Sequence, residues 1–339
     1  MKSLRGTERT LVVAPSWIGD AVLSHPLLVR LKEASPAPID VLAPPWVLPV
    51  YRRMPEVGRA IANPFGHGDL RLGDRRRFAK GLERYTRAIV LPNTLKSALI
   101  PWHAGVRVRT GWRGEMRYGL LNDLRRLDEE ALPLIVERYA ALAQPAGEAL
   151  RRPLPEPRLR VDEGARLATV AKYGLDASRP IVALAPGAEY GPAKRWPPRH
   201  FAKVANDAIA RGEAAWIFGS GKDTPVAREI RALAPGAADL TGRTTLEEAI
   251  DLLSLAARVV SNDSGLMHVA AALDRPMAAV FGSSSPAFTP PLSRNARVVS
   301  LGLACSPCFA RTCPLGHTNC LETLEPGLVE EALFPPPAP

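Results

Sequence analysis

Short apolar runs rich in β-branched residues alternate along this chain with amphipathic stretches, and this alternation limits the fold more than any other feature. It is typical of a parallel sheet flanked by helices. We expect strands at 10–14, 39–42, 59–62, 88–91, 181–185, 214–218, 258–261 and 277–281. Helices are expected at 20–31, 198–211, 224–234, 245–255 and 264–273. The pattern therefore predicts an α/β protein with doubly wound sheets.

Two domains are expected, because 339 residues exceed the roughly 100 to 200 residues of one domain. Residues 145–157 contain four prolines and suit neither a continuous helix nor a central strand. The expected division is a first domain at 1–160, a second at 161–334, and a disordered tail at 335–339. Each of the two domains is predicted to be an α/β unit.

The first residues include basic side chains but no apolar run of secretory length, since Pro15 interrupts the run at 11–14. No stretch approaches the roughly 18 apolar residues that span a bilayer. We therefore expect a cytoplasmic protein whose contact with a membrane, if there is one, is peripheral.

The net charge of +10 is concentrated in the first half, where residues 1–150 hold 23 Lys and Arg against 15 Asp and Glu. The basic residues gather between positions 69 and 126. They are Arg71, Arg75, Arg76, Arg77, Lys80, Arg84, Arg87, Lys96, Arg107, Arg109, Arg113, Arg117, Arg125 and Arg126. Such a region suits a phosphorylated substrate, an anionic membrane or nucleic acid, although a solvated basic surface explains any single arginine equally well. No nucleic-acid recognition motif accompanies the charge.

Asp20 closes the turn PSWIGD, which follows the first expected strand and opens a helix. Ligands of doubly wound sheets bind at the carboxyl ends of the strands, so this turn is a candidate site. An aspartate at a helix start is also a favourable cap for the helix dipole. Position alone favours the cap.

Two turns in the second half suit a phosphate. The segment PGAEYGPAKRWP presents Lys194 and Arg195 near a helix start, where the lysine would neutralise charge on a leaving phosphate. The segment NDSGLMH opens another helix, where Ser264 and Gly265 offer backbone N–H groups and Asp263 could hold sugar hydroxyls. An exposed basic loop and an ordinary helix cap are the alternatives.

Several motifs are missing from the sequence. It contains neither a full G-x-G-x-x-G nor a phosphate loop of the Walker type, which disfavours hydride transfer and ATP hydrolysis. It also lacks the D-x-D carboxylate pair with which many single-domain glycosyltransferases hold a divalent metal. A metal-independent transferase that needs no cofactor is expected.

The cysteines form one short cluster, with the spacing C-x2-C-x4-C-x6-C over Cys305, Cys308, Cys313 and Cys320 and with His317 inside it. This spacing is compatible with a structural four-thiolate zinc site, although it lacks the full pattern of a standard finger. Reduced thiols or a redox-dependent bridge are the alternatives.

Taken in order, the blocks PSWIGD, GHGDLRLGDRR, RTGWRGEMRYGLLND, PGAEYGPAKRWP, FGSGKD and NDSGLMHVAAAL resemble those of the bacterial ADP-heptose:lipopolysaccharide heptosyltransferases, glycosyltransferase family 9. The resemblance covers nearly the whole chain. It implies a GT-B fold, in which two Rossmann-like doubly wound domains face a central cleft, the first holding the acceptor and the second the donor. The third block favours the type that adds the second heptose. A type adding the first heptose, and less so a sugar-nucleotide 2-epimerase, are alternatives. A non-catalytic anion-binding protein is a third, which would be favoured if Asp20 were dispensable.

The resemblance also implies roles for single residues and names the partners. Asp20 matches the proposed general base of an inverting transfer from ADP-heptose, and Arg113 and Arg117 are candidates for binding the acceptor. That acceptor would be heptosyl-Kdo2-lipid A, met peripherally at the inner face of the inner membrane. The residues that match the family's donor-binding segments are Lys194, Asp263, Ser264, Gly265 and His268.

Overall fold

The computed structural model describes residues 8–66 and 68–333. The chain divides into two compact units, one ending at Glu156 and the other beginning at Pro157. This division falls four residues before the expected boundary at 160. Residues 145–157 form neither helix nor strand, as their prolines predict. The expected tail at 335–339 lies outside the described residues.

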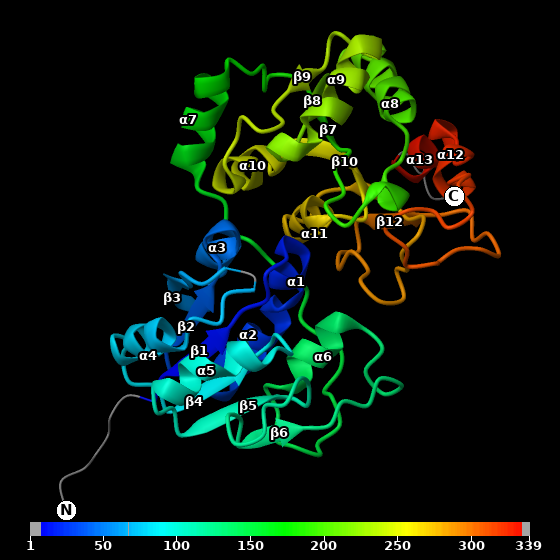
Figure 1. Cartoon of the computed structure of the whole chain (residues 1–339). Coiled ribbons are helices and arrows are strands. Elements are labelled where there is room, and N and C mark those ends of the chain that lie inside the picture. The colour runs from blue at the N-terminus through cyan, green and yellow to red at the C-terminus, as the bar shows by residue number, and fades with distance from the viewer. Residues whose placement is uncertain (1–7, 67, 334–339) are drawn as a thin grey trace, which may run out of the picture. The chain divides into compact units, whose positions relative to one another are not determined.

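The first unit is built on a parallel six-stranded sheet with helices around it (Figure 1). Its strands, in spatial order, are β3 (Val57–Ala62), β2 (Ile39–Ala43), β1 (Thr10–Val13), β4 (Arg87–Val90), β5 (Val108–Trp112) and β6 (Asp123–Arg125). Its helices are α1 (Ile18–Leu23), α2 (His25–Ala34), α3 (Leu48–Arg52), α4 (Leu72–Lys80), α5 (Leu95–His103) and α6 (Ile135–Ala141), with a 3₁₀ turn, η1, at Pro45–Val47. The central strands are buried on both faces, as helix-covered parallel strands should be.

The second unit repeats this plan. Its parallel strands, in spatial order, are β12 (Ala296–Val299), β11 (Met277–Val280), β10 (Ala256–Asn262), β7 (Ile181–Ala185), β8 (Ala214–Ile217) and β9 (Ala238–Asp239). Its helices are α7 (Glu163–Tyr173), α8 (Pro198–Ala210), α9 (Thr224–Leu233), α10 (Leu246–Leu253), α11 (Gly265–Ala272), α12 (Asn319–Glu322) and α13 (Pro326–Leu333). Two 3₁₀ turns, η2 (Pro192–Lys194) and η3 (Gly221–Asp223), lie in the loops. The predicted doubly wound α/β architecture is confirmed in both units.

Helix α8 illustrates how the sequence sets this packing. Pro198 occupies its first turn, where the missing N–H costs no hydrogen bond. Phe201, Val204, Ala205 and Ala208 recur with helical spacing, and all four are buried in the core of the second unit. The helix therefore turns one apolar face onto the sheet.

Both sheets have their first strand between their second and their fourth. In the first unit β1 pairs with β2 and β4, and in the second β7 pairs with β8 and β10. The chain reverses its direction of winding at this point, and ligands of such sheets bind just outside the carboxyl ends of the strands there. The turns after β1, β4, β7 and β10 are therefore the places to examine.

One predicted helix is divided in two. Residues 20–31 were expected to form a single helix, but α1 ends at Leu23 and α2 begins at His25. The Ser24 hydroxyl donates to the carbonyl of Ala21 at 2.7 Å, and Pro26 has no N–H to continue the ladder. These two residues explain the break.

Candidate functional site

Asp20 lies in the first turn of α1, directly beyond the carboxyl end of β1. The local sequence favours this position because the positive end of a helix stabilises a carboxylate. Two phenols lie within the electrostatic reach of Asp20. Burial raises the pKa of Tyr51 and of Tyr139, and the negative charge of Asp20 raises both further. Asp20 is therefore a partly exposed carboxylate at the switch point of the first unit, near two phenols that stay neutral.

The turn after β4 faces the same switch point and is fixed by Arg117. This side chain is 1% exposed, and it donates to the carbonyl of Pro92 at 2.6 Å, to Asn93 Oδ1 at 3.2 Å and to the carbonyl of Trp112. Through these contacts the guanidinium of Arg117 is used for hydrogen bonds inside the protein. Of the two predicted acceptor arginines, the structure brings only Arg113 to the surface, while Arg117 supports the turn.

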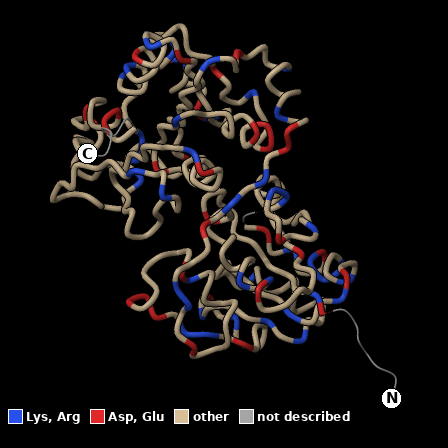
Figure 2. The backbone as a smooth tube through the Cα atoms, turned by 180° about the vertical axis from the view of Figure 1, so that it is seen from behind, with Lys and Arg blue, Asp and Glu red and all other residues tan. Residues whose placement is uncertain are grey.

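The predicted basic region separates into interior and surface arginines. Arg75, Arg109 and Arg125 donate to backbone carbonyls and so contribute to the fold. The exposed cations are Arg71, Arg76, Arg77, Lys80, Arg84, Arg107, Arg113 and Arg126, and Figure 2 marks Lys and Arg along the backbone. About half of the region is therefore available to an anionic partner.

Lys194 and Asp263 form an ion pair across the switch point of the second unit. Lys194 ends η2, in the turn that follows β7, and Asp263 directly follows β10. Lys194 Nζ lies 2.5 Å from Asp263 Oδ2, and the two side chains are 17% and 5% exposed. The ammonium also lies 5.2 Å from the centre of the Tyr190 ring. Two predicted donor residues thus meet where the topology places a ligand.

Helix α11 begins beside this pair. Ser264 is its N-cap residue, but no side-chain hydrogen bond caps the helix, and the Ser264 hydroxyl lies 3.3 Å from that of Ser261. The first N–H groups of a helix have no partner within the helix and suit an anion. Ser264 and Gly265 are partly exposed. The structure therefore places an anion-binding helix start next to the Lys194 ammonium.

His268 lies one turn further along α11, and its imidazole is buried. Burial lowers its pKa to about 4, with Asp263 opposing the shift and Lys194 adding to it. The ring is therefore neutral at pH 7. It lies close to the ion pair as a buried, uncharged polar group.

Two buried residues that the sequence analysis did not single out hold these turns. Asn262 donates to the carbonyl of Pro186 at 2.6 Å and accepts from the N–H of Trp196 at 3.0 Å, which ties the ends of the β7 turn to β10. Asp223 accepts from the N–H of Ser220 at 2.8 Å, and its carboxylate packs against Gly187. A Cβ added at Gly187 would lie 2.6 Å from Asp223 Cγ. Asn262 could have been identified from the sequence, because it is a polar residue at the end of a buried strand.

Ser283 and Ser284 follow β11 and were also not predicted. Both are buried, and their hydroxyls have no hydrogen-bond partner among the residues that the structure describes. Unpaired buried hydroxyls are costly. The sequence feature that could have identified these two serines is the run of small residues, FGSSS, which follows an apolar strand.

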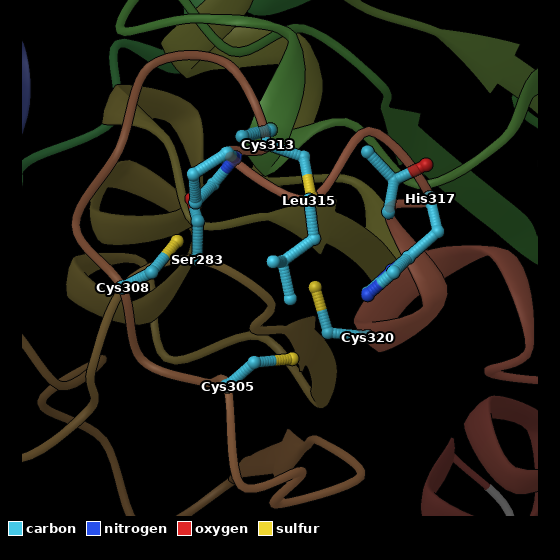
Figure 3. Close-up of a pocket in the computed structure, with 10 residues that line it drawn as sticks. Ser283, Cys305, Cys308, Cys313, Leu315, His317 and Cys320 are labelled. Carbon is cyan, nitrogen blue, oxygen red and sulfur yellow. The ribbon is translucent and has the colours of Figure 1, made fainter.

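All four cysteines, together with Ser283, Leu315 and His317, line one pocket (Figure 3). The thiols are free. Backbone N–H groups, that of Thr318 foremost, lower the pKa of Cys313, whereas burial raises the pKa of Cys320. Within the described ranges, no three His, Cys, Asp or Glu side chains already stand in a metal-binding arrangement.

Residues 75–319 match the family model described as glycosyltransferase family 9 (heptosyltransferase). The chain is 50% identical over 306 residues to lipopolysaccharide heptosyltransferase 2 of Salmonella typhimurium, a match that covers 86% of this chain and 88% of the relative. Lipopolysaccharide heptosyltransferase 1 of Pseudomonas aeruginosa is 29% identical over 333 residues, or 92% of this chain and 89% of the relative. The solved structure of Escherichia coli ADP-heptose lps heptosyltransferase II superposes with a TM-score of 0.87 at 45% identity, covering 96% of this chain and 97% of that one.

Two doubly wound units, each with polar residues gathered at the switch point of its sheet, define a glycosyltransferase of the GT-B class. The chain belongs to glycosyltransferase family 9, the heptosyltransferase family.

Proposed function

We propose that this enzyme transfers L-glycero-D-manno-heptose from ADP-heptose to the first heptose of the Kdo2-lipid A inner core, as the second heptosyltransferase of lipopolysaccharide assembly. The observation that carries the proposal is the Lys194–Asp263 pair beside the start of α11. The similarity supports this type over the one that adds the first heptose, with 50% identity against 29%.

The donor diphosphate would bind between Lys194 and the first N–H groups of α11. Without a ligand, Lys194 and Asp263 neutralise each other in a largely buried place, where a lone charge would be costly. A diphosphate would replace Asp263 as the ion-pair partner of the Lys194 ammonium, and Asp263 could then accept hydrogen bonds from sugar hydroxyls. Because negative charge grows on ADP as its bond to the sugar breaks, Lys194 stabilises the transition state more than the ground state.

Asp20 would act as the general base. The acceptor hydroxyl attacks the anomeric carbon of the donor heptose, its proton passes to Asp20, and the bond to the phosphate oxygen breaks with its electron pair leaving on ADP. This single displacement inverts the anomeric carbon. Lys194 and the helix start supply the positive field for the leaving group, so the proposal requires neither a cofactor nor a catalytic metal.

The acceptor would be held by the first unit. A phosphorylated lipid is anionic, and the exposed cations of residues 71–126, Arg113 among them, provide a matching field. No helix in the described part of the chain is long and apolar enough to cross a bilayer. We propose that the enzyme works in the cytoplasm and meets its lipid acceptor peripherally at the inner membrane.

The decisive experiment measures transfer from ADP-heptose to purified Kdo2-lipid A with and without its first heptose, in the presence of a chelator. Product on the heptose-bearing acceptor alone is expected. Product on the bare acceptor alone would instead identify an enzyme that adds the first heptose. Conversion of the sugar nucleotide without transfer would identify an epimerase, and loss of transfer with the chelator would refute metal independence.

Two variants test the assigned roles. Asp20→Asn is expected to lower turnover by about 10² to 10⁴ while donor binding, followed by calorimetry, is kept. The matched control is Glu33→Gln, which changes an exposed carboxylate on α2. Lys194→Ala is expected to weaken both donor binding and turnover, with Lys203→Ala on α8 as its control. Unchanged turnover in either test variant would refute the role given to that residue.

A further inference from the structure

The segment between β12 and α12 carries three of the four cysteines and has no regular structure of its own. Residues 300–318 form neither helix nor strand, and Cys320 lies in the short helix α12 that follows. Irregular segments of more than roughly 12 to 15 residues are uncommon in a compact domain. The segment contains exposed apolar side chains, Phe309 and Leu315. An apolar core therefore does not hold this segment in place, and another stabilising interaction is needed.

The cysteines are placed to provide one. Together they line a single pocket (Figure 3). A tight turn follows Cys313, whose carbonyl accepts from the N–H of Gly316 at 3.1 Å. Thiolate sulfurs are the preferred ligands of zinc in structural sites of this kind.

A second observation at the pocket is independent of the cysteines. Ser283 lines it, is 1% exposed, and its hydroxyl has no hydrogen-bond partner in the described part of the chain. An acceptor is thus missing at the wall of the pocket, and a thiolate held there by an ion would supply one.

We propose that Cys305, Cys308, Cys313 and Cys320 bind one zinc ion as four thiolate ligands and so fix residues 305–320. Four-sulfur tetrahedral sites of this kind are closed and structural. Without the ion the side chains do not yet converge on one point. They lie on loop backbone and on a single helical turn, so their convergence requires side-chain rotation and displacement of the exposed Leu315. His317 is left out of the ligand set because four thiolates complete a tetrahedral site and its Nδ1 accepts from the N–H of Asn319 at 3.0 Å.

The ion would also stabilise the turn that carries Lys194. The carbonyl of Arg311 accepts from the N–H of Ala193 at 3.1 Å, and the hydroxyl of Tyr190 donates to the carbonyl of Phe309 at 2.7 Å. The cysteine segment thus lies directly against η2 and the residues just before it. An effect of zinc on donor affinity rests on the proposed function, whereas zinc binding itself does not.

The first test is the metal content of the full-length protein, purified without chelator, by plasma mass spectrometry. One zinc per chain is expected for the wild type and for His317→Ala, and none for Cys308→Ser. The wild type reconstituted with cobalt should show the visible absorption of a tetrahedral thiolate site, which does not depend on any variant folding. Trypsin should cleave after Arg311 only once a strong chelator has removed the ion.

Four outcomes would overturn the proposal. They are a metal-free wild type with four reactive thiols, a metal-free wild type whose intact mass reveals disulfides, bound iron in place of zinc, and loss of zinc from His317→Ala. Transfer activity on the heptose-bearing acceptor is scored separately. An inactive protein that binds zinc would refute the proposed function alone, and an active protein without zinc would refute the metal site alone.

Discussion

His268 allows a quantitative test of the second unit, because its imidazole is buried close to both charges of the Lys194–Asp263 pair. Burial lowers its pKa to about 4, whereas a histidine in an unfolded chain titrates near 6.5. Between these values the unfolded state binds more protons than the folded state. Stability is therefore fully present above about pH 6.5 and falls as the pH drops toward 4.

The size of the loss follows from the two pKa values. Between pH 7 and 6.5 the change is small, and each further unit down to pH 4 removes about 1.4 kcal/mol. Lowering the pH from 7 to 5 should therefore cost the wild type about 2 kcal/mol more than it costs His268→Gln, which has no titrating ring.

The assay is urea unfolding of both proteins at pH 7, 6 and 5, followed by circular dichroism. The difference between the two proteins at each pH cancels the contributions of groups far from His268. A difference that widens by about 2 kcal/mol toward pH 5 is expected. If both proteins lose the same stability, the imidazole is not held neutral, and the buried placement of His268 near the ion pair is wrong.

Two further predictions concern stability. Gly191→Ala should destabilise the second unit by about 1 to 3 kcal/mol, since a Cβ there would lie 2.4 Å from the Arg311 carbonyl oxygen; Gly327→Ala, where nothing lies within 4 Å, is the control in thermal unfolding. Arg117→Leu should destabilise the first unit by about 2 to 4 kcal/mol because it leaves buried carbonyls unpaired, whereas Arg113→Ala should stay within about 0.5 kcal/mol and raise the KM for the acceptor. Equal stability losses in the two arginine variants, measured by urea unfolding, would contradict the assignment of Arg117 to the interior.

The central strands were predictable, and most of the outer ones, with the exception of the edge strand β3, were not. Strands β7 and β11 are continuous apolar runs, and β1 and β2 are apolar except for Thr10 and Asp40, because helices cover both of their faces. The four strands missing from the sequence analysis lie toward the edges of the sheets, and they are β5, β6, β9 and β12. β6 and β9 have three and two residues, and β12 is half-exposed with an arginine in its middle. Edge strands need no continuous apolar run, so their pattern is weak.

For the candidate site too, features set by neighbouring residues could be predicted, whereas features set by residues distant in sequence could not. The helix start at residues 263–265 could be predicted because a helix start after a buried strand can be read from neighbouring residues. The burial of Arg117 could not be found in this way, because its partners Pro92 and Asn93 are more than 20 residues away in sequence. Net charge marks a basic region but does not tell which of its arginines hold backbone carbonyls.

The packing of Asp223 bears on how substrate preference can evolve in this enzyme. Its carboxylate and Cβ occupy the space that a side chain would need at Gly187 and at Gly219, the glycines of two turns beside the proposed donor site. Mutational scanning should find both positions intolerant whichever sugar nucleotide is supplied. Selection for a new donor must therefore act on the side chains that project from these turns, Lys194 and its neighbours. The two glycines are constrained by the packing of the second unit and not by the donor.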